Sequence, residues 1–191
     1  MPTFGQTTEP AAFSATTVAR KRATQQVAPE NGTLVTLHAY LGCSVNSRTV
    51  DVKGLIYADN GSDFPGDLLA TSGTENISIG TTPDWYVFTF TGAEAIDFTA
   101  STKYWLCYHH DGPPSPNGSL RTYRDLDDGG LSIDVTEAFA STADPWSGGS
   151  THDGTNGIYV TYDVAGERAI APFMWIERRQ RPRRRGRTVG V

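Results

Sequence analysis

The chain has few cysteines and no long apolar run, and both absences exclude classes of protein. Cys43 and Cys107 are its only cysteines among 191 residues, too few for the disulfide framework of a small secreted domain. No apolar run approaches the roughly 18 residues that a membrane-spanning helix needs. Residues 1–10 lack the basic and apolar regions of a signal peptide, so we expect synthesis in a cytoplasm, with no membrane partner. We therefore expect two buried free thiols, with a Cys43–Cys107 disulfide as the alternative.

Helical patterning is also missing, which excludes parallel α/β folds because these need a helix between successive strands. The one helical candidate is a single turn at residues 134–139. The sequence contains 20 glycines and 11 prolines, a composition that favours short strands joined by turns. A chain of this length usually forms one domain, with or without terminal extensions. We therefore predict a single all-β domain.

Five segments show the period-two alternation that is typical of half-buried strands. In residues 103–109, Tyr104 and Leu106 fall on one face and Trp105 on the other. Turns rich in glycine, asparagine and proline separate the segments. This pattern predicts an antiparallel β-sandwich with a jelly-roll-like strand order. The five predicted strands cover residues 32–41, 49–59, 84–90, 103–109 and 157–164.

The ends of the chain lack this alternation, so we expect three units. Residues 1–22 are predicted to form an extended arm or a first edge strand, residues 23–166 the sandwich, and residues 167–191 an apolar anchor with a basic tail. From Arg178 onward the tail holds seven arginines and no acidic residue, whereas the other 177 residues hold 9 basic and 21 acidic ones. The predicted partner-binding residues are Phe173, Trp175, Arg178, Arg179, Arg181, Arg183, Arg184, Arg185 and Arg187.

Three interpretations of this tail remain open. Arginine side chains pair well with carboxylates, so the tail could dock on an acidic neighbouring subunit, which is the outcome we expect. Seven arginines could also neutralise phosphates in nucleic acid, with a strong dependence on salt. A charge run can equally stay solvated without any partner. Basic tails on acidic bodies usually seek phosphates or acidic protein surfaces, and because the acidic body should repel nucleic acid, nucleic acid binding is expected only through the tail.

The order of several landmarks resembles a β-sandwich module in virion proteins of tailed phages that infect actinobacteria. The same module also occurs beside catalytic domains in some extracellular bacterial proteins. The resemblance covers roughly residues 13–164, but Ser101-Thr102-Lys103 stands where a glycine often precedes the Tyr-Trp pair. The landmarks are, in order, Ile-Tyr at 56–57, Pro-Gly followed by Leu-Leu at 65–69, Trp85, Tyr-Trp-Leu at 104–106, Asp-Pro-Trp at 144–146 and Ile-Tyr-Val-Thr-Tyr at 158–162.

The resemblance implies a structural virion protein, such as a minor tail or capsid-decorating component, with no catalytic residue to carry over. We accordingly expect a homo-oligomer in the virion that docks on other capsid or tail subunits, after synthesis in the host bacterial cytoplasm. The alternative is an adhesin domain that binds host cell-surface glycans by stacking aromatic rings on sugars. Trp146, in a glycine-rich loop, is the aromatic residue expected to be exposed for this contact. Aromatic residues on strands, such as Trp85, are expected in the core.

Residues that could carry other chemistry favour no enzyme. The sequence has no Gly-x-Ser-x-Gly motif of the kind that places a serine nucleophile. His110 beside Asp111 could ligate a metal, but successive strand residues point to opposite faces, so His109 and His110 cannot easily share one ion. Oxygen-rich loops at 59–67 and 125–128 could bind calcium, although Asx turns explain the same residues. We expect no catalytic activity, no cofactor and no metal.

Overall fold

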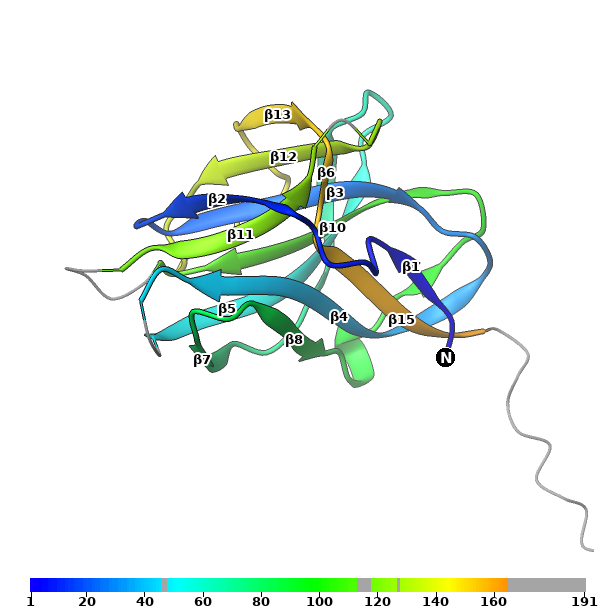
Figure 1. Cartoon of the computed structure of the whole chain (residues 1–191). Coiled ribbons are helices and arrows are strands. Elements are labelled where there is room, and N and C mark those ends of the chain that lie inside the picture. The colour runs from blue at the N-terminus through cyan, green and yellow to red at the C-terminus, as the bar shows by residue number, and fades with distance from the viewer. Residues whose placement is uncertain (46–47, 113–117, 127, 165–191) are drawn as a thin grey trace, which may run out of the picture.

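The computed structural model describes residues 1–45, 48–112, 118–126 and 128–164, and these form two antiparallel sheets packed together (Figure 1). The predicted all-β antiparallel sandwich is therefore confirmed. The described residues contain no helix that is long and apolar enough to cross a membrane. The partner-binding residues expected between Phe173 and Arg187 lie outside the described part of the chain.

The first sheet, which we call sheet A, is built around the long strand β4 (Gly32–Cys43). β4 pairs with β8 and β9 and also with β11 and β15, so it lies in the middle of the sheet. A short 3-10 helix, Gly92–Glu94, follows β8. The other strands of sheet A are β1 (Thr3–Gly5), β2 (Ala12–Thr16), β8 (Asp84–Thr89), β9 (Asp97–Phe98), β11 (Leu120–Asp125), β14 (Thr155–Asn156) and β15 (Ile158–Val164).

The second sheet, sheet B, is built around β10 (Lys103–His110), which pairs with β3 (Arg20–Val27) on one side and β5 (Arg48–Asp59) on the other. The long strands alternate between the sheets, since the chain passes from β3 to β4 to β5, and later from β8 to β10 to β11. This alternation wraps one sheet against the other. The remaining strands of sheet B are β6 (Pro65–Thr71), β7 (Glu75–Ile79), β12 (Leu131–Thr136) and β13 (Ser150–Asp153).

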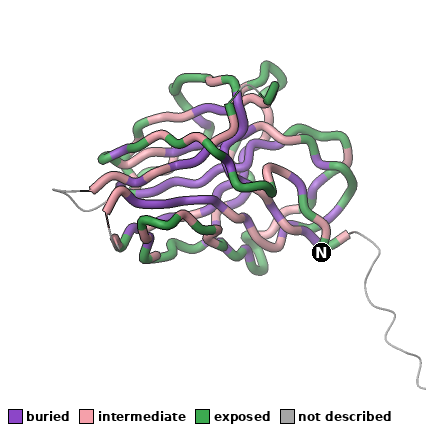
Figure 2. Tube along the Cα trace, viewed as in Figure 1, coloured by how far each residue is buried: buried purple, intermediate pink, exposed green. Residues whose placement is uncertain are grey.

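The main core lies between the sheets and follows the predicted alternation. Leu37 and Leu41 of β4 and Leu106 of β10 are fully buried there with Phe88 of β8. Figure 2 shows that the central strands are buried along most of their length, while turns and edges are exposed. Burial of such a large aliphatic or aromatic side chain contributes about 1.5–3 kcal/mol to folding. The core therefore needs no disulfide to hold it together.

The N-terminal residues are integrated into the sandwich. β1 pairs with β15 and β2 pairs with β11, so the edge-strand alternative is the one observed (Figure 1). The predicted boundary at residue 22 is wrong, because β3 begins at Arg20 and continues through the boundary. Lys21 and Arg22 are 0% and 3% exposed, and these buried charges hid the strand from the hydrophobic pattern. The helical turn expected at 134–139 is also wrong, since residues 131–136 form β12.

Both cysteines are buried free thiols, as expected. Cys43 belongs to the core between the sheets, whereas Cys107 belongs to a second cluster on the outer face of sheet B. Burial raises the pKa of the Cys107 thiol well above its usual range, so the reactive thiolate is suppressed.

Candidate functional site

Six rings form a continuous row on the outer face of sheet A, and we call this row the aromatic band. Its members come from five strands, β2, β4, β8, β11 and β15, which lie side by side in the sheet. The rings belong to Phe13, Tyr123, Tyr40, Trp85, Tyr159 and His38.

Strand alternation places these rings on one face. On β4, Leu37 and Leu41 point into the core, so His38 and Tyr40 point outward. The strand register then sets Tyr40 opposite Trp85 on β8 and His38 opposite Tyr159 on β15. Cross-strand pairs of this kind have side chains close enough to touch. The same alternation that fills the core therefore builds the band.

The centre of the band is closely packed. The His38 and Tyr159 rings are stacked, with centroids 4.3 Å apart and planes only 10° apart. The Trp85 ring lies 4.8 Å from the Tyr159 ring and 5.0 Å from the Tyr40 ring. Burial lowers the pKa of His38, so its imidazole is neutral at neutral pH. These contacts hold the rings in fixed positions.

The band continues toward the edge of the sheet. The Tyr123 ring lies 5.2 Å from Tyr40 and 5.7 Å from Phe13. The guanidinium carbon of Arg121 lies 4.8 Å from the centre of the Phe13 ring, which is a cation–π contact. Phe13 is 51% exposed and Val87, beside the band on β8, is 48% exposed. Val87 pairs with His38, so each end of the band presents one apolar side chain to solvent.

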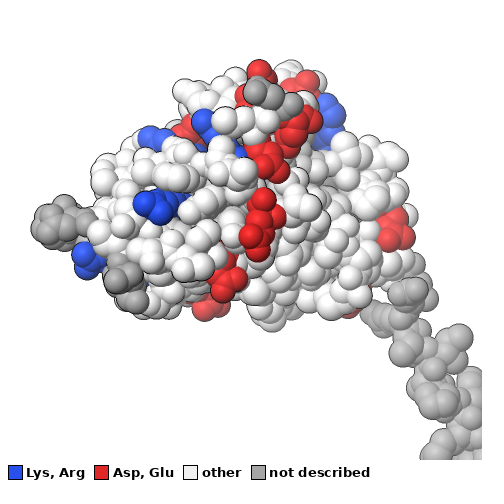
Figure 3. Space-filling view, in the orientation of Figure 1, with Lys and Arg blue, Asp and Glu red and all other residues white. Residues whose placement is uncertain are grey.

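Carboxylates accompany the rings. Burial, together with a hydrogen bond to Glu9 and the charge of Asp84, raises the pKa of Tyr40 to about 12. The Tyr40 hydroxyl is therefore protonated and donates to Glu9. Figure 3 shows acidic groups running across the face seen in the view of Figure 1, with fewer basic groups on it. Glu9 and Asp84 therefore lie beside the middle of the band, and Arg121 lies at its Phe13 end.

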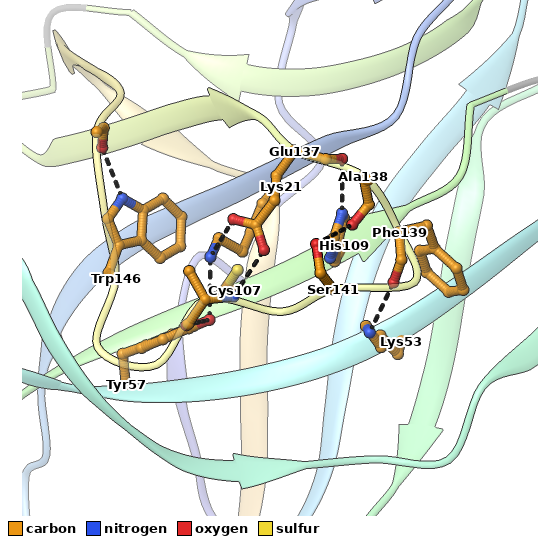
Figure 4. A network of polar contacts seen from close by, with 12 residues as sticks. Lys21, Lys53, Tyr57, Cys107, His109, Glu137, Ala138, Phe139, Ser141 and Trp146 are labelled. Carbon is orange, nitrogen blue, oxygen red and sulfur yellow. Dashed lines mark hydrogen bonds and ion pairs between the residues drawn. The ribbon is translucent and has the colours of Figure 1, made fainter.

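In contrast, the outer face of sheet B is covered by a loop that contains Trp146. This side chain is 5% exposed, so the expectation of an exposed sugar-binding residue is wrong. Its ring packs edge-on against Tyr57 at 5.1 Å, with the ammonium of Lys21 4.0 Å from the ring centre (Figure 4). Its backbone N–H donates to Gly66 O at 2.9 Å, and its indole N–H donates to Gly148 O at 2.9 Å. Trp146 therefore fastens its loop to the sheet.

Residues 137–149, which we call the cover loop, are held by a buried ion pair. Lys21 Nζ lies 2.8 Å from Glu137 Oε2 and donates to the Tyr57 hydroxyl at 3.1 Å (Figure 4). The Tyr57 hydroxyl donates to Ala143 O at 3.0 Å, and the Ala143 N–H donates to Glu137 Oε1 at 2.7 Å. A buried ion pair is tolerated when further hydrogen bonds complete it, as they do here. The network positions the cover loop.

A second group of contacts holds the start of the cover loop. Lys53 donates to Phe139 O at 3.1 Å, and its ammonium lies 4.6 Å from the centre of the Phe139 ring. His109 Nε2–H donates to Glu137 O at 3.2 Å. Burial lowers the pKa of His109 to about 4, so this imidazole is neutral at neutral pH. With the Cys107 thiol protonated, these residues form a structural clasp and supply no activated nucleophile.

The residues proposed for metals make other contacts. Within the described ranges, no group of three or more His, Cys, Asp and Glu side chains could hold a metal ion. His110 Nδ1 accepts from the Gly112 N–H at 3.1 Å, and both histidines are buried. Asp59 accepts from the Gly61 N–H at 2.8 Å, which is the contact of an Asx turn. The Asx-turn interpretation of this loop is confirmed; of the second loop, Asp127 lies outside the described residues.

No protein-family model matches the chain, and no curated protein matches it.

The alternation within residues 84–90 separates the band from the core. The expectation that Trp85 lies in the core is wrong, because its ring belongs to the band. The alternation of β8 instead buries Phe88, and this assigns Trp85 and Val87 to the opposite face. Which of the two faces would be covered did not follow from the alternation.

Proposed function

We propose that the protein is a non-enzymatic structural component of a phage virion, either a capsid-decorating or a minor tail protein, which docks on neighbouring subunits through the aromatic band. The observation that carries the proposal is the band, in which His38, Trp85 and Tyr159 are partly exposed over the buried Tyr40 and Tyr123, with the exposed side chains of Phe13 and Val87 at its two ends. Tyrosine, tryptophan and phenylalanine are enriched at protein interfaces. An exposed apolar patch with a polar surround is typical of a docking site.

The virion assignment is supported by the resemblance of the landmark residues to the phage module. Four of the six landmarks lie on β5, β6, β8 and β10, the pair at 65–66 begins β6, the landmark at 158–162 lies on β15, and the one at 144–146 lies in the cover loop. The jelly-roll strand order belongs to the same proposal. Alternation of the long strands between two sheets is compatible with it.

Electron microscopy of phage particles tests the proposal. Particles without this protein should lose a defined density on the capsid or tail. Particles carrying Trp85→Ala with Phe13→Ser should lose the same density, while the purified variant keeps the circular dichroism of the native protein. Leu69→Ala is the matched control, because Leu69 is an exposed apolar residue of sheet B. Complete density in particles that lack the protein would refute the proposal.

A carbohydrate-binding adhesin is the second candidate, and the band favours it over the other surfaces described. Trp85 and Tyr159 take the place of Trp146 as the residues that could stack on a sugar ring. Glu9 and Asp84 could accept hydrogen bonds from sugar hydroxyls. A glycan array should then show binding by the native protein that Trp85→Ala abolishes. An array with no signal above background would eliminate this candidate.

A further inference from the structure

The chemistry of the aromatic band fits a cation. The π faces of tryptophan and tyrosine attract positive charge, and Glu9 and Asp84 are exposed carboxylates at the centre of the band. A guanidinium group suits both, because it stacks on rings and pairs with carboxylates through two hydrogen bonds. The contact between Arg121 and Phe13 already shows this interaction at one end of the band.

The chain carries such cations in its own C-terminal segment. Residues 178–187 contain seven arginines and no acidic residue, whereas residues 1–164 contain 8 basic and 19 acidic residues. Two of those eight, Lys21 and Arg22, are buried. The charge of the segment and that of the sandwich are therefore complementary.

The segment follows the strand that contributes Tyr159 to the band. The last described residue, Val164, ends this strand, β15. Five strand residues span about 17 Å, whereas the fourteen residues from Val164 to Arg178 can span about 46 Å when extended. A tether of this length raises the local concentration of the arginines to the millimolar range. The arginines can therefore reach the whole band within one molecule.

We propose that residues 178–187 bind the aromatic band of the same molecule, with guanidinium groups stacked on Trp85 and Tyr159 and paired with Glu9 and Asp84. The segment then occupies the same surface that the proposed function assigns to docking. This inference rests on the proposed function for the role of the band as a docking face. The occupancy of the band by the segment is a separate property, which can be measured without a virion.

Paramagnetic relaxation enhancement on the full-length chain tests the occupancy. A nitroxide is attached at Thr188→Cys, since Cys43 and Cys107 are buried and do not compete for the label. The amide signals of Trp85 and Tyr159 should be lost to broadening, whereas that of Ile133 in sheet B should persist. Screening by about 1 M salt should restore the lost signals, because it shortens the Debye length to about 3 Å. Equal broadening of both faces, or none, would overturn the proposal.

Matched variants identify the contacts. Glu9→Gln with Asp84→Asn should restore the lost signals, and Trp85→Phe should leave the effect in place because a ring is kept. Glu75→Gln with Asp153→Asn should change nothing, since these exposed carboxylates belong to sheet B. Replacement of all seven arginines by glutamine should abolish the broadening. Persistent broadening in that variant would overturn the proposal.

A mixed sample decides between one molecule and two. Spin-labelled protein without isotope is mixed with isotope-labelled protein without the spin label, so that only intermolecular contacts cause broadening. The proposal predicts no broadening in this mixture, and loss of the Trp85 signal there would place the segment on a second copy and refute it. Absence of the intramolecular effect, together with loss of particle density in Trp85→Ala with Phe13→Ser, would refute this inference and leave the proposed function standing.

Discussion

The outer faces of the two sheets both carry aromatic side chains, but only the face of sheet B is covered by another segment of the chain. Sheet A presents Trp85 and Tyr159, which are partly exposed and pack around the buried Tyr40. Sheet B presents Tyr57 with Trp105, and the cover loop closes over them with Trp146. The difference lies in the cover loop, which the ion pair between Lys21 and Glu137 anchors. A row of aromatic residues on a strand therefore indicates a second core only where a polar anchor holds a segment over it.

The largest expected effect separates the two tryptophans. Trp146→Ala should lower the free energy of unfolding by about 3–5 kcal/mol, because it leaves a cavity under the cover loop. Trp85→Ala should lower it by about 1 kcal/mol, as expected for a half-buried surface residue. Urea denaturation of both variants measures the difference. Equal losses would show that the two faces do not differ as described.

The next largest loss of stability is expected when the ion pair between Lys21 and Glu137, which anchors the cover loop, is broken. Glu137→Gln should destabilise the protein by about 3 kcal/mol, because Lys21 is left as an uncompensated buried charge. Asp63→Asn breaks the exposed pair with Lys103 and should change little. The double variant Lys21→Met with Glu137→Gln should recover part of the loss. Denaturant midpoints measure all three, and a harmless Glu137→Gln would contradict the anchoring role.

A smaller loss of folding stability is expected when the pH is lowered. Burial lowers the pKa of His109 to about 4 and that of His110 well below its usual value, so the unfolded chain binds more protons than the folded one below about pH 6.5. The stabilisation is complete above pH 6.5 and is lost as the pH falls toward 4, at a cost on the order of 2 kcal/mol for His109. Glu137, Lys53 and Lys21 are the charged neighbours of His109.

The variant His109→Gln isolates this contribution from that of the carboxylates. The fall in its denaturant midpoint between pH 7 and pH 4.5 should be smaller than that of the native protein. An identical fall in both would rule out His109 as a source of the acid sensitivity.

The smallest effect concerns the reactivity of the two cysteine thiols. Cys107 lies on the covered face and its pKa is raised by burial, so a thiol reagent should not react with it at neutral pH until the protein unfolds. Glu137→Gln, which loosens the cover loop, should increase the reaction rate of Cys107 more than that of Cys43. Rapid reaction of both thiols in the native protein would contradict the closed cover.

Strands with regular alternation were predictable from the sequence, and those with buried charges were not. The predicted strands at 49–59 and 103–109 agree with β5 and β10 within one residue at each end. β3 was missed because Lys21 and Arg22 interrupt its apolar pattern, although both are buried. Their burial depends on partners such as Glu137, which lie far away in the chain. The jelly-roll order, the virion assignment and the docking of the arginine tail stay predictions.

The sequence alone determined which side chains share a face, because strand geometry alternates with every residue. It therefore determined the all-β class and the composition of the main core, whereas the structure decided that both thiols are free. The tertiary structure alone decided which outer face is covered, and it moved the candidate site from Trp146 to the band around Trp85. The physical reason is that alternation is a local property of each strand. The position of the cover loop depends instead on an ion pair between residues that are distant in the chain.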